Sequence, residues 1–373
     1  MPTLVLSCNL GEQPVMGGEL RLSARGQWIA AMSLAGKVAP TGPATLKVKR
    51  ERGTIDSFVG TIRFSAVAAG SETITVDLVG GRGLLTAPLP FRDTIAGATP
   101  PPAGMLLRSI VDDAGEQLAA GVETALDAFS LARWTRAGGL TGVEALDLLC
   151  DALGLSWRVQ PDGLIWAGVE TWPQTTARAT ALNPDPADGS LTFGPDGAPL
   201  LPGTTIGGFR AVSVEYLMAG SALRATVRKA LPSDPARVTS PLVYREVHAA
   251  TVRKQNDDGD GTLDLVADDL RLQGDNGLLA VPLRVGGPGL KAEVPAGTRV
   301  QVAFLDGRPD QICALSFEQD AASNRRLALV GDSVGALLFT PPATLEIVPV
   351  GTPGSVSLTI LGPGHRYLQG VPR

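Results

Sequence analysis

The densest group of possible metal ligands in the chain is the acidic segment at residues 256–264, NDDGDGTLD. Aligned as an EF-hand loop, it places oxygen donors at positions 1, 3, 5 and 9 and a glycine at position 6. The residues concerned are Asn256, Asp258, Asp260, Asp264 and Gly261, but position 12, where the ion needs a bidentate Glu, is Ala267. Residues on both sides alternate as strands do, whereas an EF-hand needs helices. We therefore predict a hairpin turn with solvated acids, not a calcium site.

A second pattern, GDSVG at residues 331–335, formally matches the G-x-S-x-G motif of a nucleophile elbow around Ser333. Such an elbow needs a helix after the serine and a histidine partner, and two prolines at 341 and 342 oppose a helix here. The chain has only two histidines, His248 inside a predicted strand and His365 in the C-terminal tail. A tail-associated cell-wall hydrolase using Ser333 and His365 is therefore an alternative interpretation, not the main one.

The cysteines do not form a recognisable metal or disulfide pattern. Cys8, Cys150 and Cys313 lie far apart, which predicts neither a disulfide framework nor a metal cluster and indicates folding in a reducing compartment. Zinc needs Cys, His or acidic ligands at short spacings, and no such group is evident. We expect Cys150 to be a core residue of a helix.

Two other patterns are also interpreted as structural. The paired carboxylates Asp112-Asp113 and Asp268-Asp269 are adjacent in sequence, so we expect solvated acids and not an opposed acid/base pair. The GGRG segment at residues 80–83 lacks a following Lys-Ser/Thr and a helix, which argues against a phosphate-binding loop. The sequence therefore predicts no catalytic, cofactor-binding or metal-ligating residues, and no enzymatic activity.

Composition indicates what kind of scaffold carries these residues. The 373 residues suffice for two to four domains, and 45 Gly and 29 Pro against 9 Phe, 5 Trp and 3 Tyr favour short strands joined by tight turns. A net charge of −5 without a basic stripe disfavours binding of duplex nucleic acid. The N-terminus does not resemble a secretory signal, and no window approaches 18 uninterrupted apolar residues. We expect a soluble protein that is intracellular when made.

The first part of the chain predicts a β domain followed by a helical insertion. Residues 1–90 contain short alternating segments, clearest at 45–49 and 73–77. A Pro- and Gly-rich linker at 89–103 leads into the insertion at 91–170. The insertion has helical signals at 105–126 and 141–154. In the second helix, Thr141 and Glu144 form a capping box, and Gly154 fits the C-terminal end. The apolar stripe of this helix comprises Val143, Leu146, Leu149, Cys150 and Leu153.

A hairpin follows, and then two further β regions. The hairpin turns at residues 161–163, and we expect Trp157 and Trp166 to pair across its strands. Residues 171–240 form a second, looser β domain with loops at 183–190 and 193–203. Residues 241–322 contain five strand-like runs, at 245–255, 262–269, 278–285, 298–306 and 311–319, which predict a five-stranded OB-type barrel. Residues 323–373 form a short β-like extension.

Several of these segments resemble parts of phage tail hubs and spikes. The run VPAGTRVQVAFLDGRPDQICAL resembles the fourth and fifth strands of the OB domain of baseplate spike proteins. RRLALVGDSVGALL is similar to the Val-Gly-Asp segment leading from that domain towards the spike. GVEALDLLCDALGLSWRVQPDGLIWAG resembles the helix-plus-hairpin insertion of tail hubs of the late control protein D group. The order of parts is also similar to the valine-glycine repeat protein of type VI secretion.

The resemblance implies a mainly β fold, with two tube-like β-barrel domains, a helical insertion, an OB barrel and a C-terminal spike-proximal extension. It implies a homotrimeric, non-enzymatic hub that joins a sixfold tail tube to a threefold spike. The implied partners are a tail tube or distal tube protein, a spike or tip protein and surrounding baseplate or wedge proteins. No cofactor or membrane is implied, and DNA is only passing cargo. The implied location is the virion tail, after synthesis in the host bacterial cytoplasm. A carbohydrate- or nucleic-acid-binding OB protein is a further alternative.

Overall fold

The computed structural model separates the chain into two compact units. Unit 1 comprises residues 1–91 and 98–241, and unit 2 comprises residues 92–97 and 242–373. The segment at 89–103, which we predicted to be only a linker, therefore contributes residues to unit 2. The structure describes residues 3–49, 55–68, 70–89, 94–96, 100–175, 180–185, 190–194, 200–206, 208–219, 222–229, 241–256, 261–273, 276–284, 290–317, 326–330, 336–339, 344–349 and 356–361.

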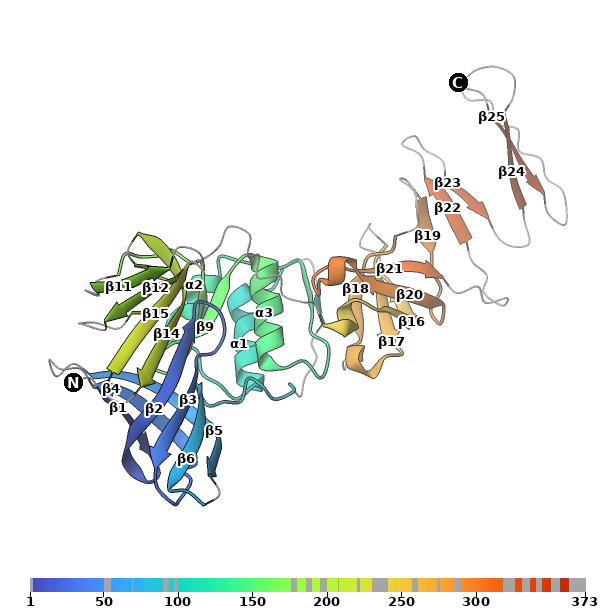
Figure 1. Cartoon of the computed structure of the whole chain (residues 1–373). Coiled ribbons are helices and arrows are strands. Elements are labelled where there is room, and N and C mark those ends of the chain that lie inside the picture. The colour runs from blue at the N-terminus through green and yellow to red at the C-terminus, as the bar shows by residue number, and fades with distance from the viewer. Residues whose placement is uncertain are drawn as a thin grey trace. The chain divides into compact units, whose positions relative to one another are not determined.

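Unit 1 begins with a closed barrel of six antiparallel strands (Figure 1). The sheet order β1-β4-β5-β6-β3-β2 closes because β1 also pairs with β2. Closure leaves no open edge on these strands, which removes a route to aggregation. The strands are β1 (Thr3–Cys8), β2 (Gly11–Ser23), β3 (Ile29–Ala35), β4 (Gly42–Lys49), β5 (Ile55–Val67) and β6 (Thr73–Gly80).

The alternation of the sequence explains the barrel core. In β4 the burial alternates between buried Ala44, Leu46 and Val48 and the residues between them. Trp28, which precedes β3, lies 2 % exposed and packs edge-on against Phe58 at a centroid distance of 6.0 Å. A Cβ atom at Gly80 would lie 2.5 Å from Nε1 of Trp28, so the indole requires a glycine there.

Strand β2 links the barrel to a second, curled sheet. It pairs with β3 through residues 15–21 and with β14 through residues 17–23, and the β3 register shifts between Val15 and Gly17. The second sheet continues from β14 in the order β15-β12-β11, with β13 paired to β14. Its strands are β11 (Thr180–Asp185), β12 (Ser190–Gly194), β13 (Thr205–Ile206), β14 (Phe209–Ala219) and β15 (Ala222–Lys229). The predicted loops are partly wrong: residues 183–185 of the loop at 183–190 belong to β11, and its last residue and the first two of the loop at 193–203 belong to β12.

Three helices make up the insertion. The capping box of α3 (Gly142–Leu153) is confirmed, since Thr141 accepts from the Glu144 N–H and the Glu144 side chain accepts from the Thr141 N–H. Gly154 ends the helix in the left-handed conformation, as predicted. The helical signal at 105–126 is instead divided into α1 (Ala103–Asp113) and α2 (Val122–Leu126). Gly115, with φ +73°, lies in the interruption.

The hairpin is confirmed as β9 (Ser156–Val159) and β10 (Ile165–Gly168), but its tryptophans do not pair. The register places Trp157 opposite Ala167 and Trp166 opposite Arg158, so the two indoles face opposite sides. Trp157 is fully buried, whereas the Arg158 guanidinium lies 4.0 Å from the Trp166 ring centroid. The hairpin docks on the barrel through hydrogen bonds between Gly26 and both Trp157 and Val159.

The core of unit 2 is a five-stranded sheet in the order β18-β17-β16-β20-β21. Its two outer strands are joined by a parallel bridge between Leu283 and Ala314, with hydrogen bonds of 2.9 Å from Ala314 N–H to the Pro282 carbonyl and from Arg284 N–H to the Ala314 carbonyl. The sheet thus closes into a small barrel. All five predicted strands are present, as β16 (Val247–Gln255), β17 (Leu263–Ala267), β18 (Leu278–Val281), β20 (Arg299–Phe304) and β21 (Ile312–Phe317).

Shorter elements complete the chain. Strand β19 (Leu290–Glu293) was not predicted and forms a three-stranded sheet with β22 and β23, while β24 pairs with β25. Three 3-10 helices flank the strands of the small barrel. The remaining bounds are β7 (Thr94–Ala96), β8 (Arg133–Thr135), η1 (Leu242–Tyr244), η2 (Leu270–Leu272), η3 (Leu305–Gly307), β22 (Arg326–Val330), β23 (Ala336–Phe339), β24 (Thr344–Pro349) and β25 (Val356–Leu361).

Candidate functional site

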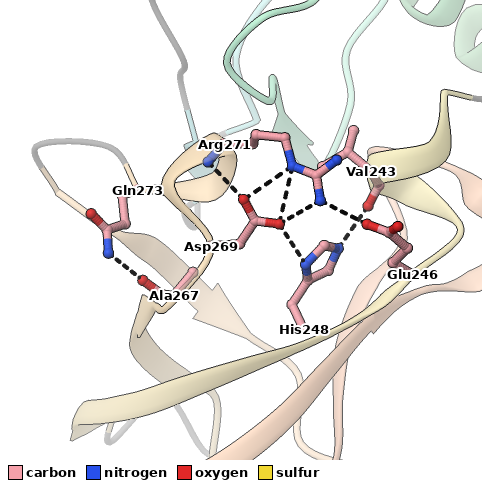
Figure 2. A network of polar contacts seen from close by, with 7 residues as sticks. All are labelled: Val243, Glu246, His248, Ala267, Asp269, Arg271 and Gln273. Carbon is pink, nitrogen blue, oxygen red and sulfur yellow. Dashed lines mark hydrogen bonds and ion pairs between the residues drawn. The ribbon is translucent and has the colours of Figure 1, made fainter.

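In unit 2, a network of charged side chains joins η1, the start of β16 and η2 (Figure 2). His248 comes from β16, and Glu246 lies just before that strand. Asp269 is the N-cap residue of η2 and accepts a hydrogen bond of 2.8 Å from the backbone N–H of Arg271. The fold thereby collects two acids, an imidazole and a guanidinium whose members are up to 25 residues apart.

His248 is buried, with only 5 % of its surface exposed, and both ring nitrogens face oxygen atoms. Nε2 lies 2.7 Å from the carbonyl oxygen of Val243, and Nδ1 lies 3.1 Å from Oδ2 of Asp269. The Val243 carbonyl and the Asp269 carboxylate can both only accept, so each ring nitrogen faces an acceptor. A ring that carries its proton on Nε2 donates it to the Val243 carbonyl and turns the Nδ1 lone pair towards the carboxylate.

Arg271 pairs with both acids of the network. Its Nη2 lies 2.7 Å from Oδ2 of Asp269 and 2.7 Å from Oε2 of Glu246, and its Nε donates to both Asp269 oxygens. The hydrogen bonds from this guanidinium lower the pKa of Asp269 to about 2, against the opposing effect of burial. Asp269 and then Glu246 in turn raise the pKa of Arg271. Asp269 is therefore a carboxylate throughout the neutral range.

The contacts of the network limit its chemistry. The polar contacts of His248 within the described residues are with Val243 and Asp269, and neither residue offers a hydroxyl or thiol nucleophile. A nucleophile–base pair would need such a group within hydrogen-bond reach. By contrast, the donor atoms of Glu246, His248 and Asp269 lie within 4.8 Å of one another. Imidazole nitrogen and carboxylate oxygen are a donor set that divalent metals accept.

Strands β16 and β17, which flank the acidic segment, pair antiparallel, so the predicted hairpin is confirmed, and Asp264 lies in β17. Asp264 is not one of the solvated acids that we expected, because it is 6 % exposed. Its Oδ1 accepts hydrogen bonds from the Ala280 N–H at 2.9 Å and from the Asn256 amide at 3.0 Å. Burial raises the pKa of Asp264, but these bonds outweigh it and leave the pKa below its usual value. Asp258 and Asp260 lie outside the described residues.

Ser333 and His365 both lie outside the described residues, so the hydrolase stays an alternative interpretation. Cys150 is buried in α3 as predicted, and burial raises the pKa of its thiol to about 12, which leaves it protonated and unreactive at neutral pH. Cys313 is also buried, and Cys8 is partly buried.

The two carboxylate pairs are only half solvated, contrary to expectation. The side chain of Asp112 is 68 % exposed, but its neighbour Asp113 accepts a hydrogen bond from Arg136, which is 1 % exposed. Asp268 pairs with Arg299 at 2.5 Å on the surface, whereas Asp269 belongs to the network described above. Adjacent side chains point in different directions, so one acid of each pair faces inward.

The GGRG segment binds a carboxylate of the chain itself. Glu116, which is 5 % exposed, accepts hydrogen bonds of 2.9 Å from the backbone N–H groups of Arg82 and Leu84. The amides that could have bound a phosphate are thus used by a buried side chain. This contact joins the end of the barrel sheet to the turn that follows α1, and it supports the structural interpretation of the segment.

A cavity of about 230 Å³ lies in unit 1 between the barrel, the hairpin and the segment before β13. Leu22 and Trp28 line it from the barrel, and Trp166 lines it from the hairpin. Arg158, held by Glu170 and stacked on Trp166, contributes the charged part of the wall. The guanidinium and the carboxylate neutralise each other, so the wall carries no net charge for a ligand.

Sequence analysis missed the Glu246–His248–Asp269–Arg271 network. Its local signal is a Glu and a His two residues apart at the start of a strand, and an Asp two residues before an Arg. Neither signal is specific on its own. Only the pairing of β16 with β17 brings the two short motifs into contact.

Comparison with known proteins gives structural resemblances but no sequence match. No protein-family model and no curated protein matches the chain. The 43 kDa tail protein of prophage MuSo2 from Shewanella oneidensis is 11% identical over 62% of this chain and 98% of its own, with a TM-score of 0.46. A tail protein from Neisseria meningitidis is also 11% identical, over 62% of this chain and 97% of its own, with a TM-score of 0.44. The Francisella PdpA–VgrG complex is 7% identical over 100% of this chain and 80% of the matched chain, with a TM-score of 0.46.

These resemblances are with phage tail proteins and a VgrG complex, but the scores are low and assign neither function nor assembly to this chain. Within the part of the chain that the structure describes, no helix has the length and apolar character needed to cross a membrane.

Proposed function

We propose that this chain is the structural hub of a phage tail or phage-derived tail, a homotrimer that joins a sixfold tail tube to a threefold spike or tip. The observation that carries the proposal is the sharing of β2 between the closed six-stranded barrel and the curled sheet. One chain thus holds two adjoining β modules in a fixed relation. Three chains around one axis bring six modules, which is the arithmetic that a threefold-to-sixfold adaptor needs.

The small barrel of unit 2 supports the spike side of this proposal. Numbered along the chain, its five strands have the order third-second-first-fourth-fifth, and the third and fifth strands meet in parallel. We assign this Greek-key connectivity to the OB type. On this proposal, residues 1–90 and 171–240 face the tube, 91–170 is the insertion, 241–322 is the OB domain and 323–373 leads to the spike.

The surface of the β modules suits repeated protein contacts. Met16, Ile29, Phe64 and Leu217 each expose between 47 % and 52 % of their surface from strands of the barrel and curled sheet. Apolar side chains on the outer face of a sheet favour burial against other subunits. The proposed partners are the tube or distal tube protein, the spike or tip protein and baseplate or wedge proteins. We place the assembled protein in the virion tail, after synthesis in the host cytoplasm, with no catalytic role and with DNA only as passing cargo.

Electron microscopy of the purified full-length chain tests the proposed symmetry. End-on class averages are expected to show threefold symmetry with six lobes of density around the rim, two per chain. Averages with twofold symmetry, or single particles with only two lobes, would contradict the adaptor role.

A further inference from the structure

The cluster of Glu246, His248 and Asp269 has the features of a metal site, independently of the proposed hub role. Its three donor atoms lie within 4.8 Å of one another and come from firmly placed segments. His248 pairs with Val302 in the ladder between β16 and β20, and Asp269 caps η2. Backbone anchoring of this kind holds ligands in place before an ion binds.

The orientation of His248 favours a cation next to its Nδ1 atom. With the ring proton on Nε2, that nitrogen donates to the Val243 carbonyl at 2.7 Å. A metal-binding histidine is usually fixed in this way, by donating its second N–H to a carbonyl or carboxylate group. The Nδ1 lone pair of the neutral ring then faces Oδ2 of Asp269 at 3.1 Å, so two acceptors confront each other. A proton or a metal ion near Nδ1 removes this conflict.

Arg271 marks the position of positive charge in the cluster. Its Nη2 atom lies 2.7 Å from an oxygen of Asp269 and 2.7 Å from an oxygen of Glu246. The Arg271 side chain is 44 % exposed, so it can rotate into solvent without burying its charge. Ion pairs at such exposure are weak, and a coordinating divalent ion can replace them.

We propose that Glu246, His248 and Asp269 form a binding site for a divalent metal ion of the zinc class, and that Arg271 is an internal cation which the metal displaces. His248 supplies Nδ1, and the two acids supply one carboxylate oxygen each. Three protein ligands leave a further position for water.

Binding of zinc to the chelator-treated full-length chain tests the proposal by calorimetry, and cobalt absorption reports the ligand type. One ion per chain is expected, with cobalt bands that lack thiolate charge transfer. Arg271→Ala is expected to bind zinc about tenfold more tightly, because the competing cation is gone, a change of about 1.4 kcal/mol. His248→Ala and Asp269→Asn are each expected to weaken binding at least about 100-fold.

Matched variants separate this site from adventitious binding. Asp268→Asn changes the neighbouring acid, which pairs with Arg299, and should leave zinc affinity unchanged. Cys8→Ser removes the partly buried thiol and should also have no effect. Should Arg271→Ala unfold, Arg271→Gln gives the same readout. Zinc binding that survives His248→Ala, that is lost in Cys8→Ser, or that is absent from a folded Arg271 variant would overturn the proposal.

Discussion

At the residue scale, buried or partly buried carboxylates accept hydrogen bonds from groups of the chain itself. Glu116 accepts from backbone N–H groups of a glycine-rich turn, Asp264 accepts from the N–H of Ala280, and Asp269 accepts from the guanidinium of Arg271. Each acid looks like a solvent-facing or ligand-binding residue in the sequence. In the structure, Glu116 and Asp264 join segments that lie far apart in the chain, whereas Asp269 holds the side chain of Arg271 two residues away.

The ion pair between Asp269 and Arg271 makes the free energy of unfolding of unit 2 depend on pH. The pKa of Asp269 is about 2 in the folded chain against an ordinary value of 3.8. The stabilisation by this pair is therefore complete above about pH 5 and is lost as the pH falls towards 2. Asp269→Asn should lower the free energy of unfolding of unit 2 by about 1 kcal/mol at pH 7 and by much less at pH 2.5. Chemical denaturation at both pH values measures this, with Asp268→Asn as the neighbouring control. An equal loss at both pH values would contradict the assignment.

Glu116 offers a second residue-scale prediction. Glu116→Ala removes the buried acceptor of the Arg82 and Leu84 N–H groups, and should cost about 1–3 kcal/mol. Urea unfolding measures the loss. Glu123→Ala is the control, because Glu123 pairs with Arg108 at a surface where such pairs contribute about 0–1 kcal/mol. Equal losses of unfolding free energy in the two variants would contradict a larger contribution from the Glu116 contact.

At the element scale, the path of β2 and the docking of α3 determine how the parts of unit 1 connect. Strand β2 passes from the barrel to the curled sheet, and Gly18 lies where it faces both β3 and β14. Helix α3 is held to the barrel by Arg25, whose guanidinium contacts Asp147 at 2.8 Å and Asp151 at 2.5 Å. The Trp157 indole also donates to Asp147, at 2.8 Å.

Gly18→Ala should destabilise unit 1, because an added Cβ atom would lie 2.4 Å from the Ala31 carbonyl oxygen. We expect a loss of about 2–3 kcal/mol, as is typical of overpacking at a rigid backbone. Gly11→Ala is a matched control, since Gly11 also has a positive φ but has no atom near the position of the added Cβ. Thermal unfolding of both variants separates the steric clash from the cost of the backbone angle. A Gly11 variant that loses as much as the Gly18 variant would refute the steric account.

Arg25→Ala should loosen α3 from the barrel. It removes two partly buried ion pairs and a hydrogen bond to the Asp147 carbonyl, and should cost about 2–3 kcal/mol. Hydrogen exchange should become faster in α3 and in β9. Arg108→Ala, at an exposed pair on α1, should leave exchange in α3 unchanged. Unchanged protection of α3 in the Arg25 variant would contradict its anchoring role.

The elements were more predictable from sequence than the contacts between them. Alternation in β4 and β6, the capping box at Thr141 and the five strands of the small barrel are local patterns, and local patterns are readable. The predicted Trp157–Trp166 pairing was wrong because the hairpin register depends on turn geometry, and a shift of one residue moves a side chain to the other face. The His248 network was not predicted because its members meet only through strand pairing. Strand β19 is too short and too rich in flanking glycine and proline to give a signal.

At the scale of the whole molecule, the proposed role follows from how the β modules repeat. A closed barrel, a curled sheet that shares β2 with it and a separate five-stranded barrel are three scaffolds in one chain. The strands of unit 1 also carry exposed apolar side chains. Such a chain is suited to connecting other proteins, and a ring of three copies is the arrangement that the hub proposal requires.

Native mass spectrometry of the purified full-length chain tests this central claim most directly. The account predicts a dominant species with three times the chain mass of 38.5 kDa, stable on dilution to low micromolar concentration. A strict monomer at every concentration, or a dimer as the only assembly, would contradict the proposed hub.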